Sequence, residues 1–394
     1  MKTGPSFPIP TTALLVPSPG SPFTLSPVLI QNLRPNELLV EIKYSGLCHT
    51  DFLLRLGALP NVTYPSIPGH EGAGTILAIG PAVQNRSLAT GDNVLLSFTS
   101  CNQCHHCGEK APSTKCKLMP PLNLSCARHD GTTAYKTEDG ATSVSGHFFG
   151  QSSFAQIAVV NELSVVPIKD MTEDEMAVWA PMGCGYQTGA GTVMEVLKPK
   201  RGDVVVIFGM GGVGFAALMA AALMLEVGTV IAVDLVEEKL RMAKEMGARW
   251  VINGRETPDV VGEIMKITGG KGVDFAVDTT GVGKVVQDMV QCLGQGGTAA
   301  SVGAPPPGVK VEVDAGVFFA MSKRWVGVVE GEVWPVEFIP RLIQAYKEGK
   351  FPVDKISKVY PVGDIEKAIA DTESGKVRAV EADDVVLDTK LTCR

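Results

Sequence analysis

The stretch VVVIFGMGGVGFAALMAAALML, residues 204–225, decides the fold. Its first five residues predict a buried strand, and the apolar run after the glycines predicts a helix. Between them, Gly209, Gly211 and Gly214 form a G-x-G-x-x-G turn. Such glycines let the backbone approach a pyrophosphate, which the N–H groups at the start of a helix then bind. A glycine-rich turn without a ligand is the alternative, but the strand before it and the helix after it favour a dinucleotide site.

The segments after this turn alternate between strands and helices. Strand 230–234 ends at Asp234, and a helix carrying Lys239 follows. We predict that Asp234 accepts hydrogen bonds from the adenosine ribose and repels a 2′-phosphate, which favours NAD over NADP, and that Lys239 braces the ribose. Further alternation up to the strand RWVGVVE, which closes the pattern near residue 329, predicts a doubly wound parallel sheet of the Rossmann type.

Residues 1 to about 165 have a different composition. They are rich in proline and glycine, and short apolar runs at 38–46, 73–80, 92–98 and 154–160 predict the strands of a β-rich barrel. Two helix-like segments at 338–349 and 364–375 lie in a tail that we expect to pack back on this barrel. The expected class is therefore α/β, with a catalytic domain at 1–185 that contains a loop at 99–153, a dinucleotide domain at 186–329, and a return at 330–394.

Composition excludes several classes of protein. The chain has 394 residues, of which 45% are hydrophobic and 20% charged, so a globular protein of two domains is expected. The net charge of −7 argues against a nucleic-acid binder, which needs a basic face. No apolar run reaches the ~18 residues of a membrane span, and the first residues lack the apolar segment of a secretory signal. We expect a cytoplasmic protein whose nine cysteines are reduced.

Four of those cysteines lie in CNQCHHCGEKAPSTKC, residues 101–116. Cys101, Cys104, Cys107 and Cys116 offer four soft donors, and a Cys-x-x-Cys turn folds such donors onto one point. The spacing predicts a structural zinc site. The histidines between the cysteines are expected to be solvated, because thiolates win at a structural zinc site.

A second group of donors is spread along the chain. Cys48 lies in GLCHTD, His70 in PGHEGAG and Cys184 in MGCGYQTG. One imidazole and two thiolates suit a catalytic zinc, because three protein donors leave a position open for water or substrate. Glu71 is a candidate fourth ligand, and Asp51 a candidate hydrogen-bond partner that fixes the tautomer of His70. Spacing alone leaves open the alternative of two buried cysteines and a core histidine that are unrelated in space.

These motifs occur in the same order in zinc-dependent medium-chain alcohol dehydrogenases, which the chain resembles from about residue 11 to 380. The resemblance is to the benzyl- or aryl-alcohol kind. It implies a GroES-like barrel beside the Rossmann domain, NAD as cofactor, one catalytic and one structural zinc per chain, and hydride transfer between an alcohol and its aldehyde or ketone. It also implies a homodimer or homotetramer, formed by extending the sheet at the strand RWVGVVE.

The resemblance assigns roles to single residues. Thr50 would take the proton of the substrate hydroxyl, and Phe98 and Phe149 would line an apolar or aromatic substrate. The residues placed at the cofactor are His49 at the pyrophosphate, Gly212 in the glycine turn, Thr188 and Val213 at the nicotinamide, the backbone of Val302 and Ala304 at its carboxamide, and Arg378 at a phosphate.

The sequence also departs from the family pattern. Leu53 stands where members often carry the histidine that ends a proton relay, so the proton leaves either through the cofactor ribose and His49 or through ordered water. The gap between Cys107 and Cys116 is one residue longer than usual, which a loop can absorb. Three alternatives remain: a glutathione-dependent formaldehyde dehydrogenase, a biosynthetic carbonyl reductase, and a non-catalytic protein that binds zinc and nucleotide.

Overall fold

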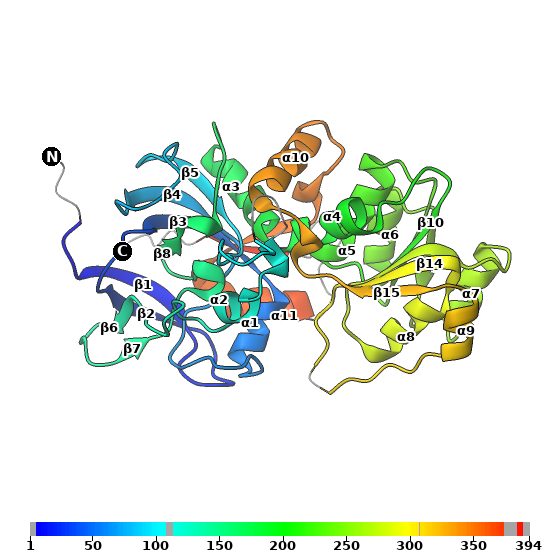
Figure 1. The fold of residues 1–394 in the computed structure, drawn as a ribbon, viewed down its shortest axis with the longest axis horizontal. Helices are drawn as coiled ribbons and strands as arrows, with labels where there is room; N and C mark the ends of the chain where they lie inside the picture. The colour runs from blue at the N-terminus through cyan, green and yellow to red at the C-terminus, as the bar shows by residue number, and fades with distance from the viewer. Residues whose placement is uncertain (1–4, 108–112, 307, 374–383, 389–394) are drawn as a thin grey trace.

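The computed structural model describes residues 5–107, 113–306, 308–373 and 384–388. It contains two regions, and Figure 1 shows them side by side with helices α4 (Gly185–Gly191) and α10 (Pro335–Lys347) between them. One region is a parallel sheet covered by helices. The other is built from antiparallel strands. Among the described residues, no helix combines the length and the apolar character needed to cross a membrane.

The parallel sheet has the strand order β12-β11-β10-β13-β14-β15. The first strand along the chain, β10, lies near the middle, and the order reverses beside it, which is the doubly wound arrangement that binds a ligand at the switch point. The strands are β10 (Val204–Phe208), β11 (Thr229–Asp234), β12 (Trp250–Asn253), β13 (Val273–Asp278), β14 (Leu293–Ser301) and β15 (Arg324–Gly327).

Strand β10 is apolar throughout because helices cover both faces of the sheet. Val205 and Ile207 pack in one apolar cluster with Phe215 of α5, whereas Val206 and Phe208 pack in another with residues of α7 and α8. The helices of this region are α5 (Gly212–Met219), α6 (Glu237–Glu245), α7 (Val260–Ile267), α8 (Gly283–Gln291) and α9 (Ala315–Ala320).

The antiparallel region contains two sheets. Seven strands form the larger one, in the order β16-β17-β3-β4-β5-β9 with β8 also paired to β3, and β1-β2-β6-β7 form the smaller. The strands are β1 (Ile9–Leu15), β2 (Thr24–Ile30), β3 (Glu37–Leu47), β4 (Gly72–Ile79), β5 (Asn93–Leu96), β6 (Tyr135–Thr137), β7 (Ser143–Val144), β8 (Ile157–Asn161), β9 (Val165–Pro167), β16 (Ser357–Pro361) and β17 (Asp384–Asp388).

The tail of the chain returns to this antiparallel region. Strand β17 pairs antiparallel with β3, and β16 pairs parallel with β17. The remaining helices are α1 (His49–Arg55), α2 (Met119–Leu124), α3 (Glu173–Trp179) and α11 (Ile365–Glu373). The fold is thus a Rossmann sheet joined to a β-rich barrel. One expected element differs, because the closing strand ends at Gly327 and residues 330–332 form a turn instead.

Candidate active site

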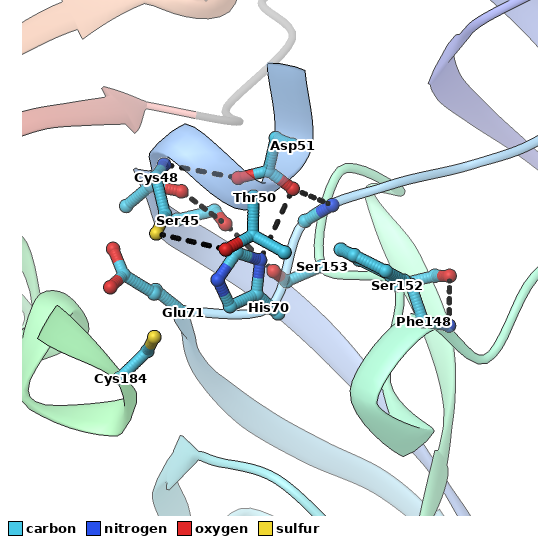
Figure 2. A network of polar contacts seen from close by, with 12 residues as sticks. Ser45, Cys48, Thr50, Asp51, His70, Glu71, Phe148, Ser152, Ser153 and Cys184 are labelled. Atoms are coloured by element: carbon cyan, nitrogen blue, oxygen red, sulfur yellow. Dashed lines mark hydrogen bonds and ion pairs between the residues drawn. The ribbon is translucent and has the colours of Figure 1, made fainter. Parts of the chain in front are cut away.

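Three remote segments bring four metal-binding side chains together. Cys48 caps the start of α1, His70 and Glu71 precede β4, and Cys184 caps the start of α4. One donor atom from each lies within 4.8 Å of the others. Figure 2 shows Cys48, His70 and Glu71 on one side and Cys184 facing them from another segment. The Nε2 atom of His70 is buried without a hydrogen-bond partner, so these residues fit a metal ion that would satisfy it.

Asp51 holds His70 in place. Its Oδ1 lies 3.2 Å from Nδ1 of His70 and accepts a hydrogen bond from the Gly69 N–H, while Oδ2 accepts one from the Cys48 N–H at 3.0 Å. The carboxyl group is fully buried, and these contacts satisfy both of its oxygens. Because Nδ1 faces Asp51, Nε2 is the nitrogen that is turned toward the sulfur atoms (Figure 2).

Charge in this cluster is arranged for a cation. The neighbouring Cys184 side chain, with the charge of His70, holds the pKa of Cys48 well below its usual value although burial opposes this. The same contact between the two sulfur atoms, together with burial, raises the pKa of Cys184. Burial lowers the pKa of His70, but the negative charges of Asp51 and Cys48 outweigh it and raise that pKa overall. Shifted pKa values among buried, interacting groups are typical of functional sites.

Glu71 approaches the cluster from inside the protein. Its side chain is 2% exposed, and Oε1 accepts a hydrogen bond from the Gly185 N–H at 2.8 Å. A Cβ atom at residue 46 would lie 1.9 Å from Oε2 of Glu71, so only glycine at that position leaves room for the carboxylate. Glu71 is therefore placed to act as an exchangeable fourth donor.

A cavity of about 540 Å³ opens beside the four donors. Cys48 and Cys184 line it, together with Thr50, whose Oγ1 lies 3.7 Å from Sγ of Cys48. The predicted cofactor residues that line the same cavity are His49, Thr188, Val213, Val302 and Ala304. The structure thus places the expected metal donors and the expected nicotinamide contacts around one space.

The wall of this cavity is largely apolar. The residues that make it so are Leu53, Leu59, Met119 and Phe149. Leu53 therefore presents a hydrocarbon side chain at the position where the sequence comparison with the family expects a proton-relaying histidine. Phe98 does not line the cavity: its side chain is 2% exposed and packs in the core of the barrel. The assignment of Phe98 to the substrate site is therefore corrected, because the side chain is turned into the barrel core.

The glycine turn fits a phosphate group. Gly209 has a φ of 90°, and a Cβ atom there would lie 2.6 Å from Oγ1 of Thr279. At Gly214 a Cβ atom would lie 1.9 Å from the carbonyl oxygen of Gly209, so both positions require glycine for packing. At Gly211, which caps α5, a Cβ atom would meet nothing within 4 Å. This free space next to a helix N-terminus, with Gly212 as the first helical residue, is where an anion can approach.

Asp234 lies at the expected end of β11, beside this turn. It accepts hydrogen bonds from the backbone N–H groups of Met210 at 2.6 Å and Val236 at 2.9 Å. These contacts fix the carboxylate at the carboxyl end of β11, where the adenosine ribose binds in folds of this type. Lys239 lies in the first turn of α6, and Arg378 lies outside the described residues.

The cysteine quartet forms a second donor cluster, with its four sulfur atoms within 4.8 Å of one another. The backbone N–H groups of Cys101 and Leu118 point at Sγ of Cys116, and that of Cys104 points at Sγ of Cys101. Hydrogen bonding from the Lys117 N–H lowers the pKa of Cys104 to about 6, whereas burial raises the pKa of Cys107 to about 12. Four sulfur donors in this arrangement fit a closed tetrahedral site.

One charged residue of the site was missed at the sequence level. Glu330 lines the cavity, and its Oε1 accepts a hydrogen bond from the Cys184 thiol at 3.2 Å. Burial raises the pKa of Glu330, although a hydrogen bond from Gln187 opposes this. The residue had been assigned to the closing strand. A carboxylate just past the carboxyl end of a parallel strand was the signal that could have found it, because ligands bind at that edge.

Comparisons with known proteins agree with this geometry. Residues 34–170 match the alcohol dehydrogenase GroES-like domain, and residues 212–348 match the zinc-binding dehydrogenase family. The chain is 37% identical to a geraniol dehydrogenase of Castellaniella defragrans, covering 91% of the chain and 93% of that protein. It is 30% identical to an S-(hydroxymethyl)glutathione dehydrogenase of Paracoccus denitrificans, over 94% of the chain and 99% of that protein. The crystal structure of benzyl alcohol dehydrogenase from Acinetobacter calcoaceticus superposes with a TM-score of 0.89 at 36% identity. The match covers 97% of this chain and 100% of that protein.

Proposed function

We propose that this chain, which belongs to the zinc-dependent medium-chain alcohol dehydrogenase family, interconverts a primary apolar or aromatic alcohol and its aldehyde with NAD as cofactor. That the chain is an enzyme of the alcohol dehydrogenase type follows from the family. The observation that carries the proposal is the single cavity that the metal donors Cys48 and Cys184 share with the nicotinamide-facing residues Thr188 and Val213.

Each part of the site has a defined task in this reaction. When bound, zinc supplies a Lewis acid for the substrate oxygen, and the nicotinamide accepts or donates a hydride. Cys48, His70 and Cys184 would hold the zinc, with Glu71 as an exchangeable donor. Thr50 is placed at the cavity to accept the hydroxyl proton, which then leaves through the cofactor ribose and His49 or through ordered water, since Leu53 cannot carry it.

The apolar wall supports the choice of substrate. Leu53, Leu59, Met119 and Phe149 offer a surface that favours hydrocarbon or aromatic groups. The relatives named for geraniol and for benzyl alcohol agree with such a pocket. A glutathione adduct is less well suited, because the described residues that line the cavity include no lysine or arginine to meet its carboxylates.

We further propose two zinc ions per chain and a preference for NAD. The carboxylate of Asp234 would accept the ribose hydroxyls and repel a 2′-phosphate. Asp234→Gly is therefore expected to shift the preference toward NADP. The measurement is kcat/KM for NAD and for NADP, each with the same alcohol, in the wild type and the variant. If the ratio does not move, another residue sets the preference.

A homodimer or homotetramer is also proposed. Strand β15 lies at the edge of the parallel sheet, and Trp325 on it is 39% exposed and lines one surface hollow with the 86% exposed Phe319 of α9. An unpaired edge flanked by apolar side chains is suited to pair with a second copy. Light scattering on the purified protein measures the mass of the assembly, and a monomer would contradict the proposal.

The proposed function is tested by a metal assay and a substrate panel. Two zinc ions per chain are expected, together with NADH formation from benzylic and allylic alcohols. Activity confined to S-(hydroxymethyl)glutathione would assign the alternative substrate, and activity confined to carbonyl reduction would assign a biosynthetic reductase. No turnover with any of these substrates, in a protein that holds both zinc ions, would refute the proposed enzyme activity.

A further inference from the structure

Glu330 places a second carboxylate beside Cys184, one member of the catalytic donor cluster. Its side chain is 6% exposed and lines the cavity. One oxygen, Oε2, accepts a hydrogen bond from Nε2 of Gln187 at 2.9 Å. The other, Oε1, lies 3.2 Å from Sγ of Cys184. The first contact fixes the direction of the carboxyl group, and the second shows that the remaining oxygen is turned toward a metal donor.

The backbone around Glu330 is held in an unfavourable conformation. Residues Glu330, Gly331 and Glu332 have φ values of 51°, 68° and 52°, which is the left-handed region that side chains disfavour. A Cβ atom at Gly331 would lie 2.5 Å from the carbonyl oxygen of Gln187, so the turn packs tightly against α4. Such a conformation persists only where its surroundings fix it, and it is concentrated at functional sites.

The 3.2 Å between Oε1 of Glu330 and Sγ of Cys184 suits two donors that share one metal ion. A cysteine binds metal as a thiolate, and a thiolate cannot donate the hydrogen bond that the Cys184 thiol gives to Glu330. Two anionic groups 3.2 Å apart in a buried site repel each other strongly. A divalent ion held by Cys48, His70 and Cys184 offsets this repulsion, because it attracts both the thiolate and the carboxylate. Carboxylate oxygen is also a common zinc ligand.

Building on the proposed zinc site, we propose that Glu330 is a further donor to the catalytic metal and reaches it from the cavity side. Glu71 reaches the same centre from the interior, beside Gly46 and Gly185. The two carboxylates therefore have different consequences. Because Glu330 lines the substrate cavity, its oxygen approaches the metal from the side on which a substrate oxygen must bind, whereas Glu71 is not among the residues that line the cavity.

The test compares the same substitution at two positions of one turn. Glu330→Gln keeps the size of the side chain and an oxygen for Gln187 but removes the charge. It is expected to weaken zinc binding at the catalytic site about 10–100-fold, measured on the full chain by competition with a chelator. Glu332→Gln is the matched control, because Glu332 has the same left-handed backbone but pairs with Lys115 at the surface. Its zinc affinity should equal that of the wild type.

Cobalt substituted at the catalytic site gives a second readout, because its visible spectrum responds to a lost carboxylate donor. Glu330→Gln should change that spectrum and Glu332→Gln should not. Wild-type zinc affinity and an unchanged spectrum in Glu330→Gln would overturn the proposal, and they would instead indicate a carboxylic acid that donates a hydrogen bond to sulfur. If Glu330→Gln fails to fold, Glu330→Asp takes its place, since it withdraws the carboxylate by one methylene and should also weaken zinc binding.

One more variant separates this proposal from the function on which it rests. Cys48→Ala should remove the catalytic zinc and retain the zinc of the quartet. If Cys48→Ala keeps both zinc ions, the proposed catalytic site itself is wrong. If Cys48→Ala loses one zinc while Glu330→Gln behaves as wild type, only the role of Glu330 is wrong.

Discussion

The two donor clusters of this protein use similar atoms but are assembled in opposite ways. The quartet draws all of its sulfur atoms from residues 101–116, and backbone N–H groups of the same segment point at them. The other cluster draws on residues 48, 70, 71 and 184, and a buried carboxylate, that of Asp51, orients its imidazole. The first is a local structure, whereas the second exists only when the barrel and the start of α4 meet.

This difference in assembly matches a difference in chemistry. Four thiolates complete a tetrahedron and leave nothing free, so the quartet can stabilise a loop but cannot hold a substrate. The mixed cluster borders a cavity, which leaves room for an oxygen ligand. A ligand set gathered from remote segments can be placed beside a cofactor site, because its position is set by the packing of two regions and not by one loop.

The largest expected effect comes from breaking the remote cluster. Cys48→Ala should lower turnover by about 10⁴-fold or more, the equivalent of ~5.5 kcal/mol, because the metal that polarises the substrate oxygen is lost. NAD binding should change little, since the glycine turn lies elsewhere. Steady-state kinetics measure turnover, and the change in NADH fluorescence on binding measures the affinity for the cofactor. Unchanged turnover would refute the catalytic role of this cluster.

Breaking the local cluster should instead affect stability. Cys104→Ala is expected to destabilise the protein by about 4 kcal/mol or more, because metal binding at the quartet is coupled to folding of its segment. Calorimetry with and without added zinc measures the change. A melting temperature equal to that of the wild type would mean that the quartet holds no metal.

A smaller effect is expected from the residue that orients the remote cluster. Asp51→Asn keeps the shape of the side chain but removes the charge that faces Nδ1 of His70. Zinc affinity at the catalytic site should fall about 10–100-fold, while that of the quartet stays constant. Chelator titration resolves the two sites. Equal losses at both would show that the variant acts through global unfolding and not through His70.

The smallest expected effect tests whether the two clusters are independent. Lys115, next to Cys116, forms an ion pair of 2.7 Å with Glu332, which belongs to the turn that carries Glu330. Exposed pairs of this kind contribute less than about 1 kcal/mol. Lys115→Met should therefore leave catalytic zinc affinity and turnover close to wild type. A marked loss of either, relieved by Glu332→Gln, would show that the quartet segment controls the active site.

Local chemistry explains which predictions from the sequence succeeded. Strand β10 matches the predicted residues because its apolar run and the glycines after it define both ends. The family assignment rested on several short motifs in a fixed order, and the comparisons confirm it. Phe98 was misplaced because an aromatic residue in a strand reveals neither its face nor its depth, and here it lies in the barrel core.

By itself, the sequence determined the Rossmann sheet, the barrel, the cysteine quartet and the identity of the remote donors, because each is encoded in a run of neighbouring residues or in a family motif. Only the tertiary structure decided that Cys48, His70 and Cys184 meet at one point and that Glu330 contacts Cys184. The physical reason is that contacts between remote segments depend on how layers pack. A left-handed turn held against α4 leaves no periodic pattern along the chain.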